Sequence, residues 1–203
     1  MATPEPQLNA PDPTRTPEAD VDDAFVRRWS PRSFSSEPRE PEQVRSLFEA
    51  ARWAPSASNL QPWLFVYAND EKTLARARPI LRDGNRRWAD RAPLLVFVFA
   101  RRSNPTTGEV NRLAAFDTGA AWMSLALQAQ KLGLVAHAMG GIHPERAYAI
   151  LGVRSEDYES LCAVAVGRRA APDSLPDDLR AREVPSTRKA IAEFALRGAF
   201  KSG

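Results

Sequence analysis

The stretch Pro93-Leu-Leu-Val-Phe-Val-Phe-Ala100 is the longest apolar run of the chain, and it decides which folds the rest can adopt. Its side chains are apolar without alternation, which predicts a β-strand that is covered on both faces. Residues 117–132 then form a helical pattern that is apolar nearly all round, and Gly133 is placed to end it. A helix without a polar face lies either at the centre of a domain or in an interface between subunits.

Shorter patterns on both sides of this strand indicate further elements. Proline suits the first turn of a helix, and short apolar runs between turn residues are typical of strands. The alternation of strands and helices is loose, which predicts an α+β sandwich. The expected strands are residues 63–67, 134–138 and 162–166; the expected helices begin at Pro41, run from His143-Pro144 to Gly152, and cover residues 187–196.

Length and composition exclude several classes of protein. The chain has 203 residues, of which 43% are apolar, so it can bury a core of its own. A single cysteine, Cys162, excludes a disulfide framework and a cysteine-rich zinc or iron–sulfur site, and two histidines disfavour a histidine-built metal site. The apolar run is too short to span a bilayer, and the N-terminus lacks the pattern of a signal peptide. We therefore expect a soluble, cytoplasmic protein without a metal and without a membrane partner.

The N-terminal twenty residues differ from the remainder. Residues 1–20 contain five prolines and almost no large apolar side chain, so they cannot bury enough surface to offset the entropy of ordering. We expect a disordered or extended arm there, and one domain over residues 21–203. The role of this arm is left open by the sequence.

The basic residues are mostly arginines, 24 against four lysines, while the net charge is only +3. A basic excess can indicate nucleic-acid binding. Here carboxylates are interleaved with the arginines and no nucleic-acid motif occurs, so a bias of composition explains the excess better. Binding to nucleic acid is the weakest alternative.

Three segments carry residues that packing alone does not require. The first is Arg27-Arg-Trp-Ser-Pro-Arg-Ser-Phe34, in which Pro31 holds Ser30 extended, so that Arg28, Ser30 and Arg32 can point the same way. Two guanidiniums with a hydroxyl between them suit a phosphate. By itself this segment fits a solvated basic loop better.

The second segment is Ala54-Pro-Ser-Ala-Ser-Asn-Leu-Gln-Pro-Trp63, a loop that two prolines stiffen. Its small polar side chains can hydrogen-bond the edge of a flat heterocycle, although an ordinary rigid turn explains it equally well. The third is Ala138-Met-Gly-Gly-Ile142, where paired glycines allow a backbone to approach a ligand closely.

Other signals of chemistry are absent from the sequence. The glycines form neither a dinucleotide fingerprint nor a P-loop, and no nucleophile elbow is present. His143, before Pro144, is interpreted as a helix N-cap, His137 as a satisfied core histidine, and Cys162 as an inert small apolar residue. Hydrolysis by a protein nucleophile therefore has little support.

Taken together, these segments resemble the FMN-dependent nitroreductase family, which includes nitroreductases, flavin reductases and iodotyrosine dehalogenases. The resemblance runs from about residue 22 to residue 196, and the ordered set of motifs is specific although each motif alone is weak. Besides the three segments, it rests on Ala92-Pro93, Asp117-Thr-Gly-Ala-Ala121, Ala165-Val-Gly167 and Ser186-Thr-Arg-Lys189. It implies a central, mostly antiparallel sheet flanked by helices, and a homodimer with FMN sites at the subunit interface.

The resemblance also assigns residues to the flavin. Arg28, Ser30 and Arg32 would hold the phosphate and ribityl end, helped by Arg188 or Lys189, and the loop around Asn59 would come from the other subunit. Gly140 stands where some members have a glutamate, which leaves a backbone N–H as the expected partner of N5 and no catalytic side chain. The expected cofactor-binding residues are Arg27, Arg28, Trp29, Ser30, Arg32, Pro55, Ser56, Ala57, Ser58, Asn59, Gln61, Asn85, Arg87, Met139, Gly140, Gly141, Arg188 and Lys189.

The function implied by the resemblance is a flavin-dependent oxidoreductase. Hydride would pass from NADH or NADPH to flavin N5 and then to a nitroaromatic, a quinone or a similar electron-poor acceptor, in a ping-pong cycle. Reductive dehalogenation or oxygen-dependent flavin cleavage on the same fold, and a non-catalytic flavin-binding protein, are the alternatives. Neither the physiological acceptor nor the choice between NADH and NADPH follows from the sequence.

Overall fold

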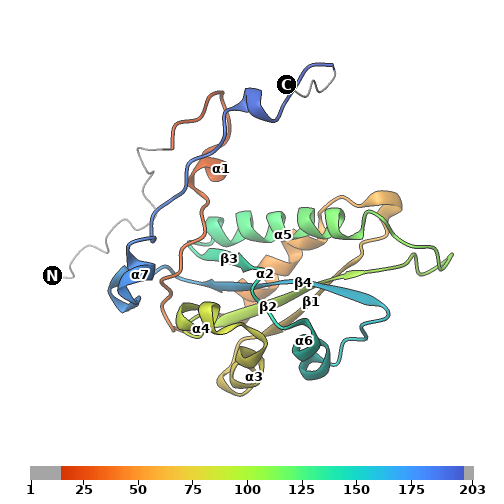
Figure 1. The fold of residues 1–203 in the computed structure, drawn as a ribbon, viewed down its shortest axis with the longest axis horizontal. Coiled ribbons are helices and arrows are strands. Elements are labelled where there is room, and N and C mark those ends of the chain that lie inside the picture. The colour runs from red at the N-terminus through yellow and green to blue at the C-terminus, as the bar shows by residue number, and fades with distance from the viewer. Residues whose placement is uncertain (1–14, 199–203) are drawn as a thin grey trace.

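The computed structural model describes residues 15–198, which fold around one four-stranded antiparallel sheet (Figure 1). The order of strands across the sheet is β1-β2-β4-β3, so the two longest strands lie at its centre. The mixed architecture with an antiparallel sheet confirms the predicted fold class. The strands are β1 (Trp63–Ala68), β2 (Leu94–Arg101), β3 (Val135–Met139) and β4 (Tyr158–Gly167).

Strand β2 is covered on both faces, as its sequence predicted. Its side chains from Leu94 to Ala100 are all buried, and they alternate between two separate apolar clusters. Leu95, Phe97 and Phe99 face one cluster, while Leu94, Val96 and Val98 face the other. An uninterrupted apolar run is therefore needed here because neither face of the strand meets water.

Helices form a layer on each face of the sheet (Figure 1). The first layer consists of α2 (Pro41–Arg52) and α5 (Ala114–Lys131), which pack against each other and against Val96 and Val98. The second layer supplies the apolar side chains of the other cluster. Its helices are α3 (Glu71–Ala77), α4 (Asp83–Ala89) and α6 (Pro144–Leu151), with α7 (Asp177–Arg180) beside them.

Helix α5 is apolar on nearly all sides, but the chain buries only one of them. Ala121, Leu125 and Ala129 are buried against the sheet and α2. The opposite side remains open, since Phe116 is 77% exposed in the chain. The helix begins three residues earlier than expected, and Gly133, with φ of +69°, follows its end. Its outer face is thus apolar without a cover from the same chain.

The expected last helix over residues 187–196 is wrong. The chain is extended to Ala190, and only a short 3-10 turn forms at Ile191–Glu193. This segment lies along the N-terminal residues instead of on the core, where Ile191 N donates to Glu18 Oε2 over 3.1 Å. A short helix needs an apolar face packed on a core to be stable, and the described segment has none.

Some elements were not expected from the sequence. They are short, so their apolar periodicity spans too few residues to stand out. Helix α3 nonetheless has a local signal, a capping box between Asp70 and Thr73. The unexpected elements are α1 (Asp23–Arg27), α3, α4 and α7.

Of the expected arm at residues 1–20, residues 1–14 lie outside the described residues. Residues 16–20 are exposed, without helix or strand, and Arg15 Nη1 donates to the Arg28 carbonyl over 3.0 Å. Among residues 15–198, every helix is too short or too polar to cross a bilayer.

A close contact at Gly167 provides a test of the packing. A Cβ added there would lie 2.8 Å from Pro93 Cδ and 3.1 Å from Phe34 Cδ1, and the proline ring cannot swing away. Gly167→Ala should therefore lower the free energy of unfolding by about 1–3 kcal/mol. In Gly84→Ala, used as the control, the added methyl meets open space, so stability should not fall. Urea unfolding measures both; equal stability of the two variants would contradict this packing.

Candidate functional site

A cavity of about 420 Å³ lies between three parts of the chain that are distant in sequence. These parts are the segment after α1, strand β3 and the segment after α7. Four guanidiniums and two hydroxyls line the cavity, and its wall contains no carboxylate among the described residues. We call it the arginine cavity, and its lining residues are Arg28, Trp29, Ser30, Arg32, His137, Ala181, Arg182, Val184, Pro185, Ser186 and Arg188.

The structure brings Arg28, Ser30 and Arg32 together in this wall, and Arg28 Nη1 lies 3.4 Å from Ser30 Oγ. Arg188 joins them from the C-terminal segment. Burial lowers the pKa of Arg28, and repulsion from Arg188 and Arg15 lowers it further. Cations crowded in this way are stabilised by an anion, so the cavity is suited to a phosphate or a similar group.

The turn that carries these side chains is anchored by Glu183, which is only 6% exposed. Its carboxylate accepts hydrogen bonds from the backbone N–H groups of Arg32 and Ser33, each over 2.9 Å. On the same turn, Ser33 Oγ donates to the Ala171 carbonyl over 2.6 Å. The N-terminal and C-terminal segments are therefore fixed to each other behind the cavity.

His137 anchors the same turn from the opposite side. Its Nδ1 lies 2.9 Å from the carbonyl oxygen of Pro31, and its ring centre lies 4.5 Å from that of Trp88. Burial lowers the pKa of His137 to about 4, and the charges of Arg32 and Arg28 contribute to this. The histidine is satisfied, as expected, yet it also forms part of the cavity wall.

The paired glycines, Gly140 and Gly141, follow directly after Met139, the last residue of β3. Asn85 Nδ2 donates to the Gly141 carbonyl over 2.9 Å, and an added Cβ on Gly141 would lie 2.5 Å from that nitrogen. At Gly140 an added Cβ would meet nothing within 4 Å, so the space beside this residue is open. Met139 itself is buried, with 3% exposure.

The loop from Pro55 to Gln61 is held in a strained conformation. Ser58, Asn59 and Gln61 have φ values of 48°, 53° and 47°, which non-glycine residues rarely adopt. Ala57 N donates to the buried Asp117 carboxylate over 3.1 Å, and Gln61 N donates to Ser56 Oγ over 3.0 Å. This loop does not line the arginine cavity of the described chain.

The remaining expected site residues lie elsewhere. Arg87 forms an ion pair with Asp178 over 2.6 Å, and the Arg27 guanidinium pairs with Asp23 over 2.5 Å. Neither residue lines the arginine cavity. Lys189 lines a neighbouring cavity instead.

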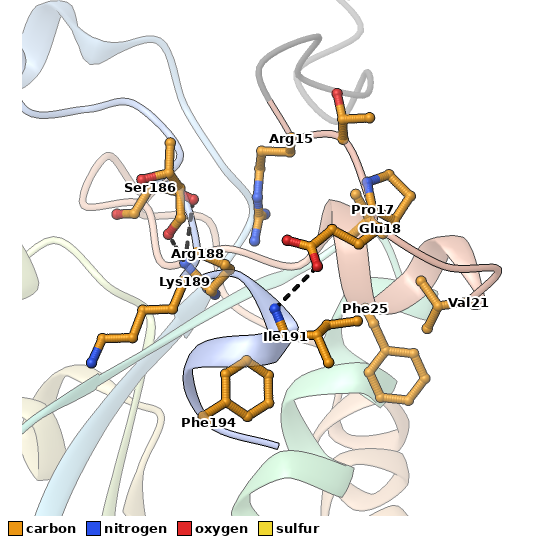
Figure 2. A pocket seen from close by; sticks show the side chains of 13 residues that line it. Arg15, Pro17, Glu18, Val21, Phe25, Ser186, Arg188, Lys189, Ile191 and Phe194 are labelled. Carbon is orange, nitrogen blue, oxygen red and sulfur yellow. Dashed lines mark hydrogen bonds between the residues drawn. The ribbon is translucent and has the colours of Figure 1, made fainter. Parts of the chain in front are cut away.

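That neighbouring cavity, of about 790 Å³, lies between residues 15–26 and 186–194 (Figure 2). Arg188 lines both cavities. The other end is apolar, with Val21, Phe25, Ile191 and Phe194 on its walls. Both cavities thus depend on how the two terminal segments pair.

Neither a reactive thiol nor a metal site is found among the described residues. Burial raises the pKa of the Cys162 thiol to about 11, so it remains protonated at neutral pH. Within residues 15–198, no three His, Cys, Asp or Glu side chains gather in a way that could hold a metal ion.

Sequence reasoning did not assign to the site five polar residues of this arrangement: Asp117, His137, Arg182, Glu183 and Ser186. Alternation along β3 places His137 on the same face as Val135 and Met139, which pack in the core, so the pattern indicated core packing rather than a cavity wall. Asp117 lies within a quoted motif and, though charged, is buried. No pattern indicated Glu183 or Arg182, because their partners lie about 150 residues away.

Comparisons with known proteins agree on the kind of fold. The model of the nitroreductase family matches residues 26–168. A Streptomyces coelicolor protein, provisionally named NADH dehydrogenase/NAD(P)H nitroreductase, is 27% identical over 70% of this chain and 80% of its own. A Streptococcus pyogenes protein, provisionally named NAD(P)H nitroreductase, is 33% identical over only 36% of each chain.

Among solved structures, an oxidoreductase containing FMN is 41% identical to this chain. Its TM-score is 0.89, and the alignment covers 93% of this chain and 97% of the other. The similarity therefore extends over nearly the whole chain.

The low pKa of His137 predicts a specific loss of stability in acid. The ring is neutral in the folded protein above about pH 4, whereas its ordinary pKa is 6.5. Protons therefore bind the unfolded chain preferentially as the pH falls from about 6.5 to 4, and the melting temperature should fall over this range. His137→Asn, which cannot titrate, should show a smaller decrease. Equal decreases in both proteins would mean that the pKa of His137 is not lowered in the folded state.

Proposed function

The chain belongs to the nitroreductase family, and we propose that it is an FMN-dependent oxidoreductase that uses NADH or NADPH to reduce an electron-poor acceptor such as a nitroaromatic or a quinone. The arginine cavity is the observation that carries this proposal. Its guanidiniums and hydroxyls, without a carboxylate in the wall, match the chemistry of a flavin phosphate. When bound, FMN would supply the redox chemistry, taking hydride at N5 and giving it up in a separate half-reaction.

In this proposal Arg28, Ser30 and Arg32 hold the phosphate end, and Arg188 completes the cluster. The positions of their side chains support this role, since all of them line one cavity. Arg188 is a better candidate than Lys189, which lines only the neighbouring cavity. The four side chains would bind and orient the cofactor without taking part in proton transfer.

The ring end of the cofactor is proposed to lie along Gly140 and Gly141. Open space beside Gly140 supports a close approach, and the hydrogen bond from Asn85 fixes the Gly141 carbonyl. The backbone would thus present its polar groups to the ring edge from a rigid position.

We further propose that the working unit is a homodimer in which the Pro55–Gln61 loop of one subunit completes the site of the other. The loop is preorganised by Asp117 but does not line its own chain's arginine cavity. The open apolar face of α5, including Phe116, supports an interface there.

Light scattering tests the dimer, and the expected mass is that of two chains. Phe116→Glu places a charge on the exposed face of α5, so it should shift the protein toward monomers and weaken FMN binding, because loop and cavity then separate. An interface of this kind buries about 2,000–5,000 Å². A wild-type monomer that retains FMN and oxidises NADPH would contradict the proposal.

Anaerobic reduction tests the function itself. FMN bound to the wild-type protein should lose its visible absorbance when NADH or NADPH is added, and regain it when a nitroaromatic or a quinone follows. Bound FMN that neither nucleotide bleaches would indicate a flavin-binding protein without this activity. Bleaching followed by halide release from a halogenated phenol, with no reaction of the other acceptors, would instead indicate reductive dehalogenation.

Arg28→Ala tests the assignment of the phosphate. A charge-assisted hydrogen bond contributes about 1.5–3 kcal/mol, so FMN should bind roughly tenfold more weakly, or worse. Riboflavin lacks the phosphate, and its affinity should change little. Arg154→Ala, at an exposed arginine that pairs with Asp157, is the control and should leave both affinities unchanged. Equal losses for the two flavins in Arg28→Ala would make Arg28 a structural residue.

A further inference from the structure

His137 touches the turn of the arginine cavity at its middle residue. The Pro31 carbonyl that it contacts lies between Ser30 and Arg32, and both of these residues line the cavity. Pro31 is buried, while the side chains on either side of it reach the cavity. A shift at this carbonyl would therefore move two of the anion-binding groups at once.

The chemistry of the contact defines which nitrogen carries the proton. A carbonyl oxygen can only accept a hydrogen bond, so Nδ1 is the donor over the 2.9 Å that separates it from Pro31 O. At neutral pH the ring is uncharged and carries one N–H, and the backbone of Ser30 next to Pro31 also contributes to its hydrogen bonding. Stacking on Trp88, a buried residue of α4, holds the ring in place.

The turn is thus restrained from two sides that belong to different elements. Glu183 holds the N–H groups of Arg32 and Ser33 from the C-terminal segment, and His137 holds the Pro31 carbonyl from β3. The restraint opposes the repulsion between Arg28 and Arg188, two of the guanidiniums that line the cavity. Neighbouring groups that are fixed before binding lose less entropy when the anion arrives.

We propose that His137 is a positioning residue: its Nδ1–H bond to the Pro31 carbonyl fixes the direction in which the Ser30 and Arg32 side chains point. Through them it sets the affinity for the phosphate of the bound flavin. This inference rests on the proposed function, because it takes the anion to be the flavin phosphate. His137 acts through the turn and needs no contact with the reacting atoms.

Three substitutions at this position separate the hydrogen bond from the bulk of the ring. The amide nitrogen of His137→Asn lies as many bonds from the backbone as Nδ1, whereas that of His137→Gln matches Nε2 instead. His137→Leu offers no donor. All three lose the stacking on Trp88, so differences among them report on the bond to Pro31.

The measurement is the affinity of each apoprotein for FMN and for riboflavin, from flavin fluorescence at pH 7.5. His137→Leu and His137→Gln should bind FMN about three- to tenfold more weakly than His137→Asn, as expected for one hydrogen bond. Riboflavin affinities should agree within about twofold across the three variants. His143→Asn is the matched control, since the His143 side chain makes no capping bond, and it should behave as wild type.

Several outcomes would overturn the inference. Equal FMN affinities of the Asn, Gln and Leu variants would do so, and so would parallel losses for FMN and riboflavin. If His137→Leu does not fold, the Asn and Gln variants decide the question alone. A wild-type protein that shows no preference for FMN over riboflavin would refute the phosphate assignment and this inference with it, whereas a preference that all variants retain refutes the inference only.

Discussion

The need to cover strand β2 on both faces determines most of this structure. Phe97 and Val98 point to opposite sides, and each requires an apolar layer of its own. Helices α2 and α5 form one layer, while α3, α4 and α6 form the other. Burial of both faces is the largest favourable contribution to folding that the chain offers, and it leaves the polar and charged residues at the margins of the sheet.

The candidate site lies at one such margin, where the terminal segments pass β3 at the edge of the sheet (Figure 1). Cations are gathered there without a carboxylate in the cavity wall, an arrangement that is unfavourable until an anion binds. Two anchors, the buried Glu183 and the partly buried His137, keep the arginine-bearing turn in position nonetheless. Binding capacity is therefore maintained by the scaffold behind the site as well as by the groups that face the ligand.

The Pro55–Gln61 loop is likewise held in place by a residue outside it. Its residues adopt left-handed conformations that cost energy, and Asp117 on α5 holds the loop in that shape. Such strain is tolerated because α5 is itself packed firmly on the sheet. Rigid elements thus position both groups of polar residues, although the two groups do not meet within one described chain.

The sequence by itself determined the covered strand, the long apolar helix, the α+β class and the family resemblance, which in turn implied the antiparallel sheet. The first four depend on periodicity or on motifs that are contiguous in the chain. It also predicted that Arg28, Ser30 and Arg32 could point the same way, because an extended backbone places alternate residues on one side. It did not predict the irregular C-terminal segment, since a local helical pattern says nothing about whether a core is present to receive it.

Only the tertiary structure decided which distant residues complete the cavity. Glu183 contacts a turn about 150 residues earlier, and His137 reaches Pro31 across 106 positions. Arg87 and Arg27 were expected at the cofactor; in the described chain they pair with Asp178 and Asp23 and do not line the arginine cavity. Short-range patterns cannot encode such pairings, because the partners meet only after both faces of β2 are covered and the terminal segments have been brought to the edge of the sheet.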